Sequence, residues 1–244
     1  MKISTKIWRP LIDKLDAKLD GACLRRDAYL GKVLGIELPA LDSEVCLVNS
    51  DASEKFIFER LDQFDRKPVS LSLPDEVVQR LNAICERKRI VRDAFFNRLV
   101  LMLAASPKQI DRLFFPHEKD WMNIVWTECK HDGPFFENTV YPLEHDIDPF
   151  WAIRMGIDLF SENDSGEELE YQVPETGETV KVRKDPFTEN ISLSSGLYSD
   201  IFHDKVFKDT DLYGFNCYVP DWRVPGHQAE AEYRNKLDEL LVDL

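Results

Sequence analysis

Polar and hydrophobic residues alternate in two short stretches of the chain. In residues 2–8, Lys2, Ser4 and Lys6 point to one side while the residues between them are Ile, Thr and Ile. In residues 69–73, Val and Leu alternate with Ser70 and Ser72. Strict alternation is typical of a β-strand with one buried face. The pattern therefore predicts two strands, each with a polar outer face.

A helical pattern follows each predicted strand. Pro10 and Pro74 suit the first turn of a helix, and apolar residues then recur at helical spacing through residues 11–19 and 77–85. A second helix is predicted from about residue 23 to 34, ended by Gly35, and its counterpart from about residue 89 to 103. A further helix is predicted between the two segments, at residues 54–64.

The two strand–helix–helix segments are copies of one another. Residues 26–34 align with residues 92–100, both opening on Arg-Asp-Ala, and the same offset of 66 residues continues upstream without a gap. Apolar positions coincide, as with Ile3 and Val69. The repeat predicts an N-terminal domain of residues 1–104, with copies at 1–35 and 67–104 joined by a linker at 36–66. Residues 105–244 form the remaining domain.

The charge is distributed unevenly along these parts. The chain has a net charge of -14, but the two copies carry +4 and +3, the linker -5 and residues 105–244 carry -16. The hydrophobic fraction of 43% is enough to bury a core. No apolar run of about 18 residues and no signal peptide is present, and the five cysteines are scattered. The sequence therefore predicts a cytoplasmic protein without a membrane span or a disulfide framework.

The repeated unit resembles the ribbon-helix-helix superfamily of the Arc and MetJ repressors. Residues 69–77 (VSLSLPDEV) are similar to the strand and helix start of that family, and residues 25–28 and 91–94 to the opening of its second helix. The resemblance covers about residues 1–35 and 67–103. The TraY proteins of conjugative plasmids offer a parallel for two such units in one chain. The expected fold class is α+β, with a tandem ribbon-helix-helix pseudo-dimer at the N-terminus.

This resemblance implies that the two strands pair within one molecule and enter the major groove of duplex DNA. The residues expected to face base edges are Lys2, Ser4, Lys6, Ser70 and Ser72. The residues expected near phosphates, around the starts of the second helices, are Arg25, Arg26, Lys88 and Arg89. The implied function is sequence-specific DNA binding in a prokaryote, as a transcriptional repressor or an accessory factor of a plasmid or mobile element.

The acidic domain of residues 105–244 matches no family pattern. It predicts a mixture of elements: strands at 123–126 and 213–219, a hairpin over 168–173 and 178–182, and a helix over 228–244. Its role is open. It is a candidate surface for a protein partner, so an antitoxin-like or DNA-mimicking interaction protein is the alternative to a repressor.

Two groups of residues in this domain are candidate chemical sites. Cys129 and His131, with His117 and His145, have no spacing of a common zinc module. Glu144, Asp146 and Asp148 surround His145 but are better explained as a solvated acidic loop. The sequence therefore predicts no catalytic residue, no metal and no cofactor, and a protein that is not an enzyme. It leaves the oligomeric state beyond the pseudo-dimer open.

Overall fold

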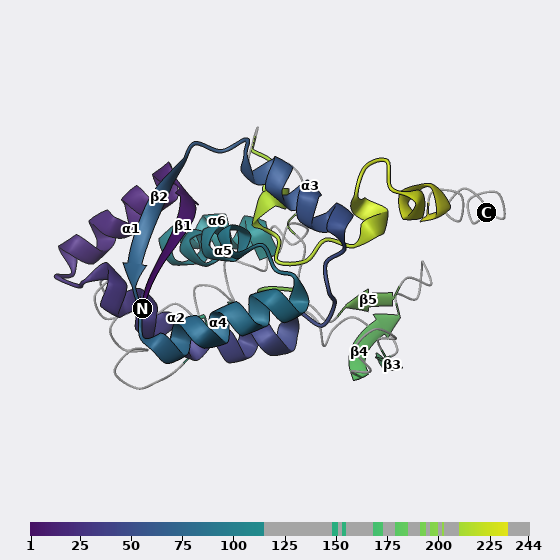
Figure 1. Cartoon of the computed structure of the whole chain (residues 1–244), viewed down its shortest axis with the longest axis horizontal. Coiled ribbons are helices and arrows are strands. Elements are labelled where there is room, and N and C mark those ends of the chain that lie inside the picture. Colours follow the sequence, from purple (N-terminus) through teal and green to yellow (C-terminus); the bar gives the residue numbers. More distant parts are fainter. Residues whose placement is uncertain are drawn as a thin grey trace.

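Two strands far apart in the sequence pair as an antiparallel ribbon, and helices follow each strand (Figure 1). This computed structural model describes residues 1–114, 148–150, 153–154, 168–172, 179–184, 191–193, 196–199, 202 and 210–233. The fold is α+β. No helix in the described ranges is long and apolar enough to cross a membrane.

The N-terminal region consists of two strands and six helices in the order of the predicted repeat. The first copy and linker hold β1 (Lys2–Trp8), α1 (Arg9–Gly21), α2 (Arg26–Glu44) and α3 (Asp51–Leu61). The second copy holds β2 (Arg66–Ser72), α4 (Asp75–Lys88) and α5 (Arg92–Ala104), and is followed by α6 (Pro107–Phe114). The predicted strands and helices are thus present in both copies, and so is the helix in the linker.

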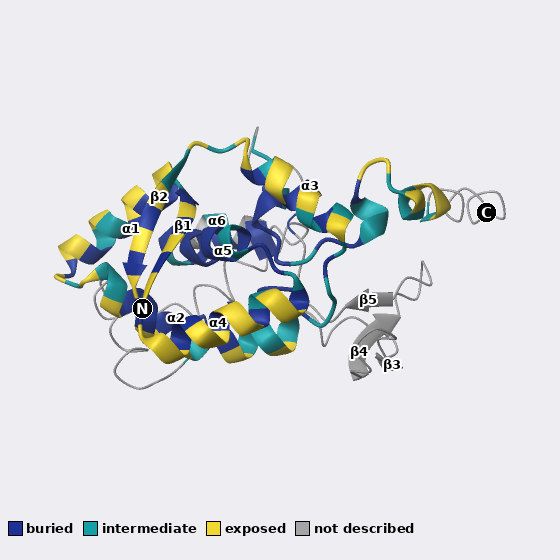
Figure 2. Cartoon of the chain, viewed as in Figure 1, coloured by how far each residue is buried: buried dark blue, intermediate teal, exposed yellow. Residues whose placement is uncertain are grey.

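The ribbon buries one face and exposes the other. Ile3, Ile7 and Leu71 are buried, whereas the alternating polar positions are exposed (Figure 2). The pairing expected within one chain is present, since β1 and β2 face each other antiparallel from Lys2 opposite Ser72 to Trp8 opposite Arg66. Burial of alternate side chains fixes this register, because a slip by one residue would turn the apolar side chains to solvent.

The helices of the two copies pack across the ribbon onto each other. Helix α1 contacts α5 of the other copy, and α2 contacts α4. Fully buried Leu15 and Leu81 of the first helices join Val33 and Leu99 of the second helices in one hydrophobic core. Neither copy encloses this core alone, so the two copies stabilise each other.

Helix α2 ends ten residues later than predicted, at Glu44 instead of residue 34, because Gly35 does not end it. The helix continues to Glu44 with Leu38 and Leu41 fully buried at helical spacing, and Pro39 is accommodated on its exposed side. Burial of the extra turns outweighs the cost of one glycine and one proline in the interior of the helix.

The described residues of the C-terminal part include a small three-stranded sheet and two 3-10 turns. The strands are β3 (Glu168–Gln172), β4 (Thr179–Lys184) and β5 (Ile191–Leu193), and the turns are η1 (Tyr213–Phe215) and η2 (Asp221–Arg223). Strands β3 and β4 pair antiparallel as the predicted hairpin, and β5 pairs with β4. Residues 228–233 are helical, as predicted, while residues 234–244 and the predicted strand at 123–126 lie outside the described residues.

The strand predicted at residues 213–219 is wrong. The chain turns at η1, and residues 214–217 are all buried, so burial does not alternate there. Gly214 lies against α3 so closely that a Cβ at this position would be 2.7 Å from the backbone nitrogen of Leu61. This segment packs into the same core as the repeats, together with Leu197, Tyr198 and Phe202.

Candidate nucleic-acid interface

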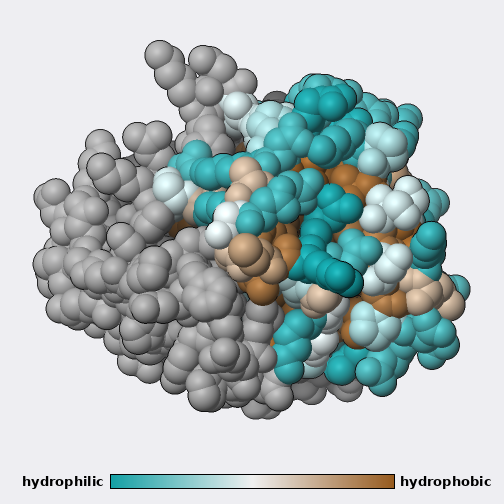
Figure 3. Space-filling view, turned by 90° about the vertical axis from the view of Figure 1, so that its left-hand side faces the viewer, coloured by the Kyte–Doolittle hydropathy of each residue, from teal (hydrophilic) through white to brown (hydrophobic). Residues whose placement is uncertain are grey.

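The exposed face of the ribbon carries three opposed pairs of residues. Lys2 lies opposite Ser72, Ser4 opposite Ser70, and Lys6 opposite Pro68. All six residues are exposed, because they alternate with the buried positions of the strands. Five of them are the residues predicted to face base edges, and the ribbon brings all five to one surface. On the side of the molecule that carries α1, hydrophilic residues predominate in the described surface (Figure 3).

An Arg–Asp pair at the start of each second helix binds the outer edge of the ribbon. In α5, Arg92 Nη2 donates to the Ser4 carbonyl at 2.9 Å and Asp93 Oδ1 accepts from the Lys6 backbone N–H at 3.1 Å. The same arrangement recurs 66 residues away, at Arg26 and Asp27 of α2. Edge strands present unpaired backbone groups, and in β1 these groups are satisfied by a helix of the other copy.

In α2, Arg26 Nη2 lies 3.5 Å from the Ser70 carbonyl, and Asp27 Oδ2 accepts from the Ser72 backbone N–H at 2.8 Å. The two Arg–Asp clamps therefore obey the sequence repeat, each holding the strand of the opposite copy. The Arg-Asp-Ala motif shared by both copies signals this role, whereas the sequence predicts a phosphate contact for Arg26 and assigns no role to Arg92. The two halves are therefore related by an approximate twofold axis, which passes through the Ser4–Ser70 pair.

One helical turn after the clamps the two halves differ, and each side chain there suits its own neighbour. Asn97 of α5 accepts from the Trp8 N–H at 2.8 Å and donates to the Lys6 carbonyl at 2.9 Å. The equivalent of Asn97 is Gly31, and the equivalent of Trp8 is Pro74, which has no N–H to satisfy. A Cβ at position 31 would lie 3.2 Å from the Pro74 ring, so glycine makes room for this proline.

Three cations remain available at this surface. Lys2, Lys6 and Arg25 are exposed, and none forms an ion pair with another described residue. Arg25 immediately precedes α2. Arg26, by contrast, lies 3.1 Å from an Asp16 carboxylate oxygen, so its charge is already paired.

Lys88 and Arg89 do not have the surroundings expected of phosphate contacts. Lys88 is only 4% exposed, and its ammonium group donates to the Val45 carbonyl. The expectation for Lys88 is therefore wrong, because the side chain turns into the protein. Arg89 ends α4 in a left-handed conformation and forms ion pairs with Asp51 and Glu54 of the acidic linker.

A second polar cluster joins α2 to the C-terminal region. Glu37 is fully buried, and its carboxylate accepts from Arg154 at 2.8 Å and from the Tyr198 hydroxyl at 2.6 Å. Burial raises the pKa of Glu37 even though Arg154 opposes this shift, and burial also raises the pKa of Tyr198. Asp148 pairs with the same arginine. These groups satisfy one another, which is typical of a structural contact.

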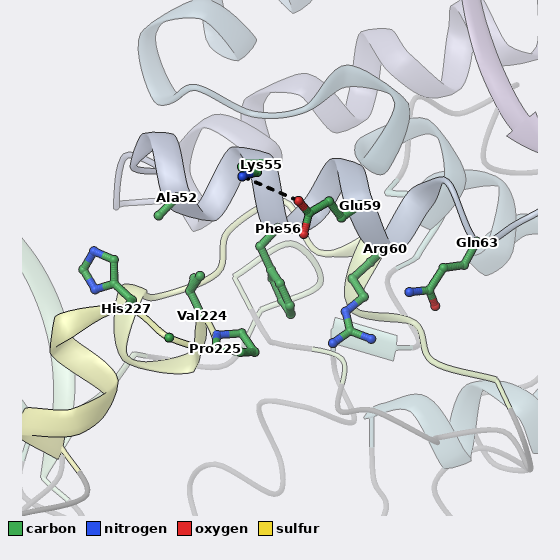
Figure 4. A pocket seen from close by; sticks show the side chains of 10 residues that line it. Ala52, Lys55, Phe56, Glu59, Arg60, Gln63, Val224, Pro225 and His227 are labelled. Carbon is green, nitrogen blue, oxygen red and sulfur yellow. Dashed lines mark ion pairs between the residues drawn. The ribbon is translucent and has the colours of Figure 1, made fainter.

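An open cleft of about 500 Å³ lies between α3 and residues 224–227 (Figure 4). Its charged side chains are paired, with Arg60 Nη1 2.9 Å from Asp211 and Lys55 Nζ 3.8 Å from Glu59. The described residues hold no cluster of three or more metal-ligating side chains. Cys129, His131, His117, His145, Glu144 and Asp146 lie outside the described residues.

Comparison with known proteins finds no relative of this chain. No family model, no curated protein and no solved structure matches the chain. The ribbon and its surroundings are therefore the features that indicate a function.

Proposed function

We propose that this chain is a tandem ribbon-helix-helix protein that binds duplex DNA sequence-specifically by placing its ribbon in the major groove. The observation that carries the proposal is the exposed ribbon face, with Lys2, Ser4, Lys6, Ser70 and Ser72 together on one surface. The protein then acts in the cytoplasm as a transcriptional repressor or as an accessory factor of a plasmid or mobile element, and not as an enzyme.

The shape and chemistry of the face support this reading. The major groove of B-DNA admits a two-stranded ribbon, and base edges there present hydrogen-bond acceptors and donors in a distinct pattern for each base pair. Lysine donates to guanine O6 and N7, while serine either donates or accepts. The Arg–Asp clamps hold the backbone of the ribbon, which keeps its outward side chains in a fixed register.

The charge balance also bears on how the protein would bind. Lys88 and Arg89 are engaged by the protein itself, so fewer cations are left to neutralise phosphates. Non-specific affinity for DNA comes mainly from phosphate contacts, and the net charge of -14 opposes it further. The proposal therefore expects weak binding to random DNA and a large contribution from base contacts.

The experiment is selection of duplexes by the full-length chain from a randomised pool, followed by titration of the best duplex. Lys2→Ala and Lys6→Ala are each expected to cost about 1–3 kcal/mol of binding free energy. Lys55→Ala removes the same charge from α3 and serves as the matched control, expected to change the affinity little. If no duplex is enriched, the proposal fails, and the interaction-protein alternative takes its place.

A further inference from the structure

The two ends of the ribbon differ in every outward position except the central one. The approximate twofold axis relates residues 66 apart, so Ser4 corresponds to Ser70, to which it is paired. It also relates Lys2 to Pro68, and Lys6 to Ser72. A lysine on one half thus corresponds to a proline or a serine on the other, although the backbone arrangement is equivalent.

Each end of the ribbon consequently has its own chemistry. One end pairs Lys2 with Ser72, so two hydrogen-bonding side chains are directed outward. The other end pairs Lys6 with Pro68, which leaves a single donor beside an apolar ring. Apolar side chains in the major groove suit the methyl group of thymine, whereas lysine suits guanine.

The helix starts that flank the ribbon are unequal in the same direction. Arg26 and Asp27 place the start of α2 beside Ser70 and Ser72, at the Lys2 end. There, the residue that precedes the helix is the exposed Arg25. At the Lys6 end the corresponding residue, before α5, is Val91, which is only 4% exposed. Two of the three available cations, Lys2 and Arg25, therefore lie at one end of the ribbon, and Lys6 lies at the other.

We infer that one chain binds a non-palindromic DNA site in a single orientation. The Lys2 end of the ribbon, which presents more hydrogen-bonding and charged side chains, then contacts the half-site with which more contacts are made. This inference rests on the proposed function and specifies its target. Two identical halves would be satisfied by a palindrome, but here a palindrome would present one half with the wrong partners. Both Lys2 and Lys6 lie on β1, so the pattern of guanines they select is not repeated by β2.

The test compares the motifs that the full-length chain and a symmetrised variant select from a randomised duplex pool. Pro68→Lys with Ser72→Lys gives both strands the same outward residues, at exposed positions outside the core. Gln228→Lys with Ala231→Lys adds the same charge at exposed positions in residues 228–233 and is the matched control.

We expect a non-palindromic motif for the natural chain and the charge control, with one protein per duplex, and a near-palindromic motif for the symmetrised variant. Lys2→Ala and Lys6→Ala should each lower affinity roughly 5- to 150-fold and relax opposite halves of the motif. A palindromic motif selected by the natural chain would overturn the inference while leaving DNA binding intact. Failure to enrich any duplex would instead refute the proposed function, and the inference with it.

Discussion

Asp27 accepts a hydrogen bond from the backbone N–H of Ser72 at 2.8 Å, so the first turn of α2 holds the strand of the other copy. Asp93 does the same for Lys6 at 3.1 Å. The two bonds are equivalent in the repeat, yet Asp93 has more partners, because Thr5 Oγ1 also donates to it at 2.8 Å and Arg66 lies 3.4 Å away. The two clamps should therefore differ in strength.

Asp27→Ala is expected to lower the free energy of unfolding by about 1–2 kcal/mol, and Asp93→Ala by about 2–4 kcal/mol. Loss of Asp93 leaves two donors without an acceptor and Arg66 without one of its carboxylate partners. Chemical denaturation of the two variants measures this difference. Asp20→Ala, an exposed position on α1, is the control. Equal losses in both clamp variants would contradict the ranking.

Gly31 and Gly35 lie one turn apart in α2 and should respond differently to replacement by alanine. A Cβ at Gly35 would have no atom within 4 Å, so Gly35→Ala should stabilise the protein by roughly 0.5–1 kcal/mol through helix propensity. A Cβ at Gly31 would press on Pro74 at 3.2 Å, which should cancel this gain or reverse it. Thermal unfolding of the two variants is the measurement, and a clear gain for Gly31→Ala would show that Pro74 can move.

The cysteines are expected to differ in reactivity and in their effect on stability at high pH. Burial raises the pKa of the Cys217 thiol to about 12, whereas Cys23 is exposed. An unfolded thiol has a pKa near 8.5. The stability contributed by the protonated thiol is therefore fully present below about pH 8.5 and is lost as the pH rises toward 12.

At pH 8, a thiol reagent should modify Cys23 in the native protein and leave Cys217 unmodified, as read by mass spectrometry of the digested protein. The alkaline decline in the free energy of unfolding should be shallower in Cys217→Ala than in the natural chain. Rapid native-state labelling of Cys217 would show that the segment around η1 opens readily.

The sequence predicted the ribbon better than its surroundings, for a physical reason. Alternation reports which face of a strand is buried, and the repeat offset indicates which strands are partners. Neither says where a long side chain finds its charge partner. Lys88 and Arg89 were expected on DNA, but Asp51 and Glu54 of the linker lie beside Arg89 in space, which no local pattern encodes.

The predicted boundary at residue 104 separates residues that pack against each other. Arg98 of α5 is fully buried, donating to the Leu197 carbonyl and lying 3.9 Å from the Phe202 ring centroid. Helix α5 is apolar around most of its circumference, which is the pattern of a helix buried on all sides. This pattern was a signal that residues beyond 104 cover it, so a fragment ending there would expose part of its core.

The ribbon joins two strands of one molecule. This affects how its assembly depends on protein concentration and how far the sequences of the two halves can differ. A ribbon shared between two separate chains dissociates as the protein concentration falls, because its assembly is bimolecular. Here the 57 residues from Arg9 to Asp65 tether the strands, so assembly does not depend on the number of copies in a cell. In a dimer of identical chains, a substitution occurs in both halves at once. Here the two halves have separate residues, so a substitution in one half leaves the other unchanged. Gly31 and Asn97 show the outcome, since each has adapted to its own neighbour while the shared backbone frame is retained.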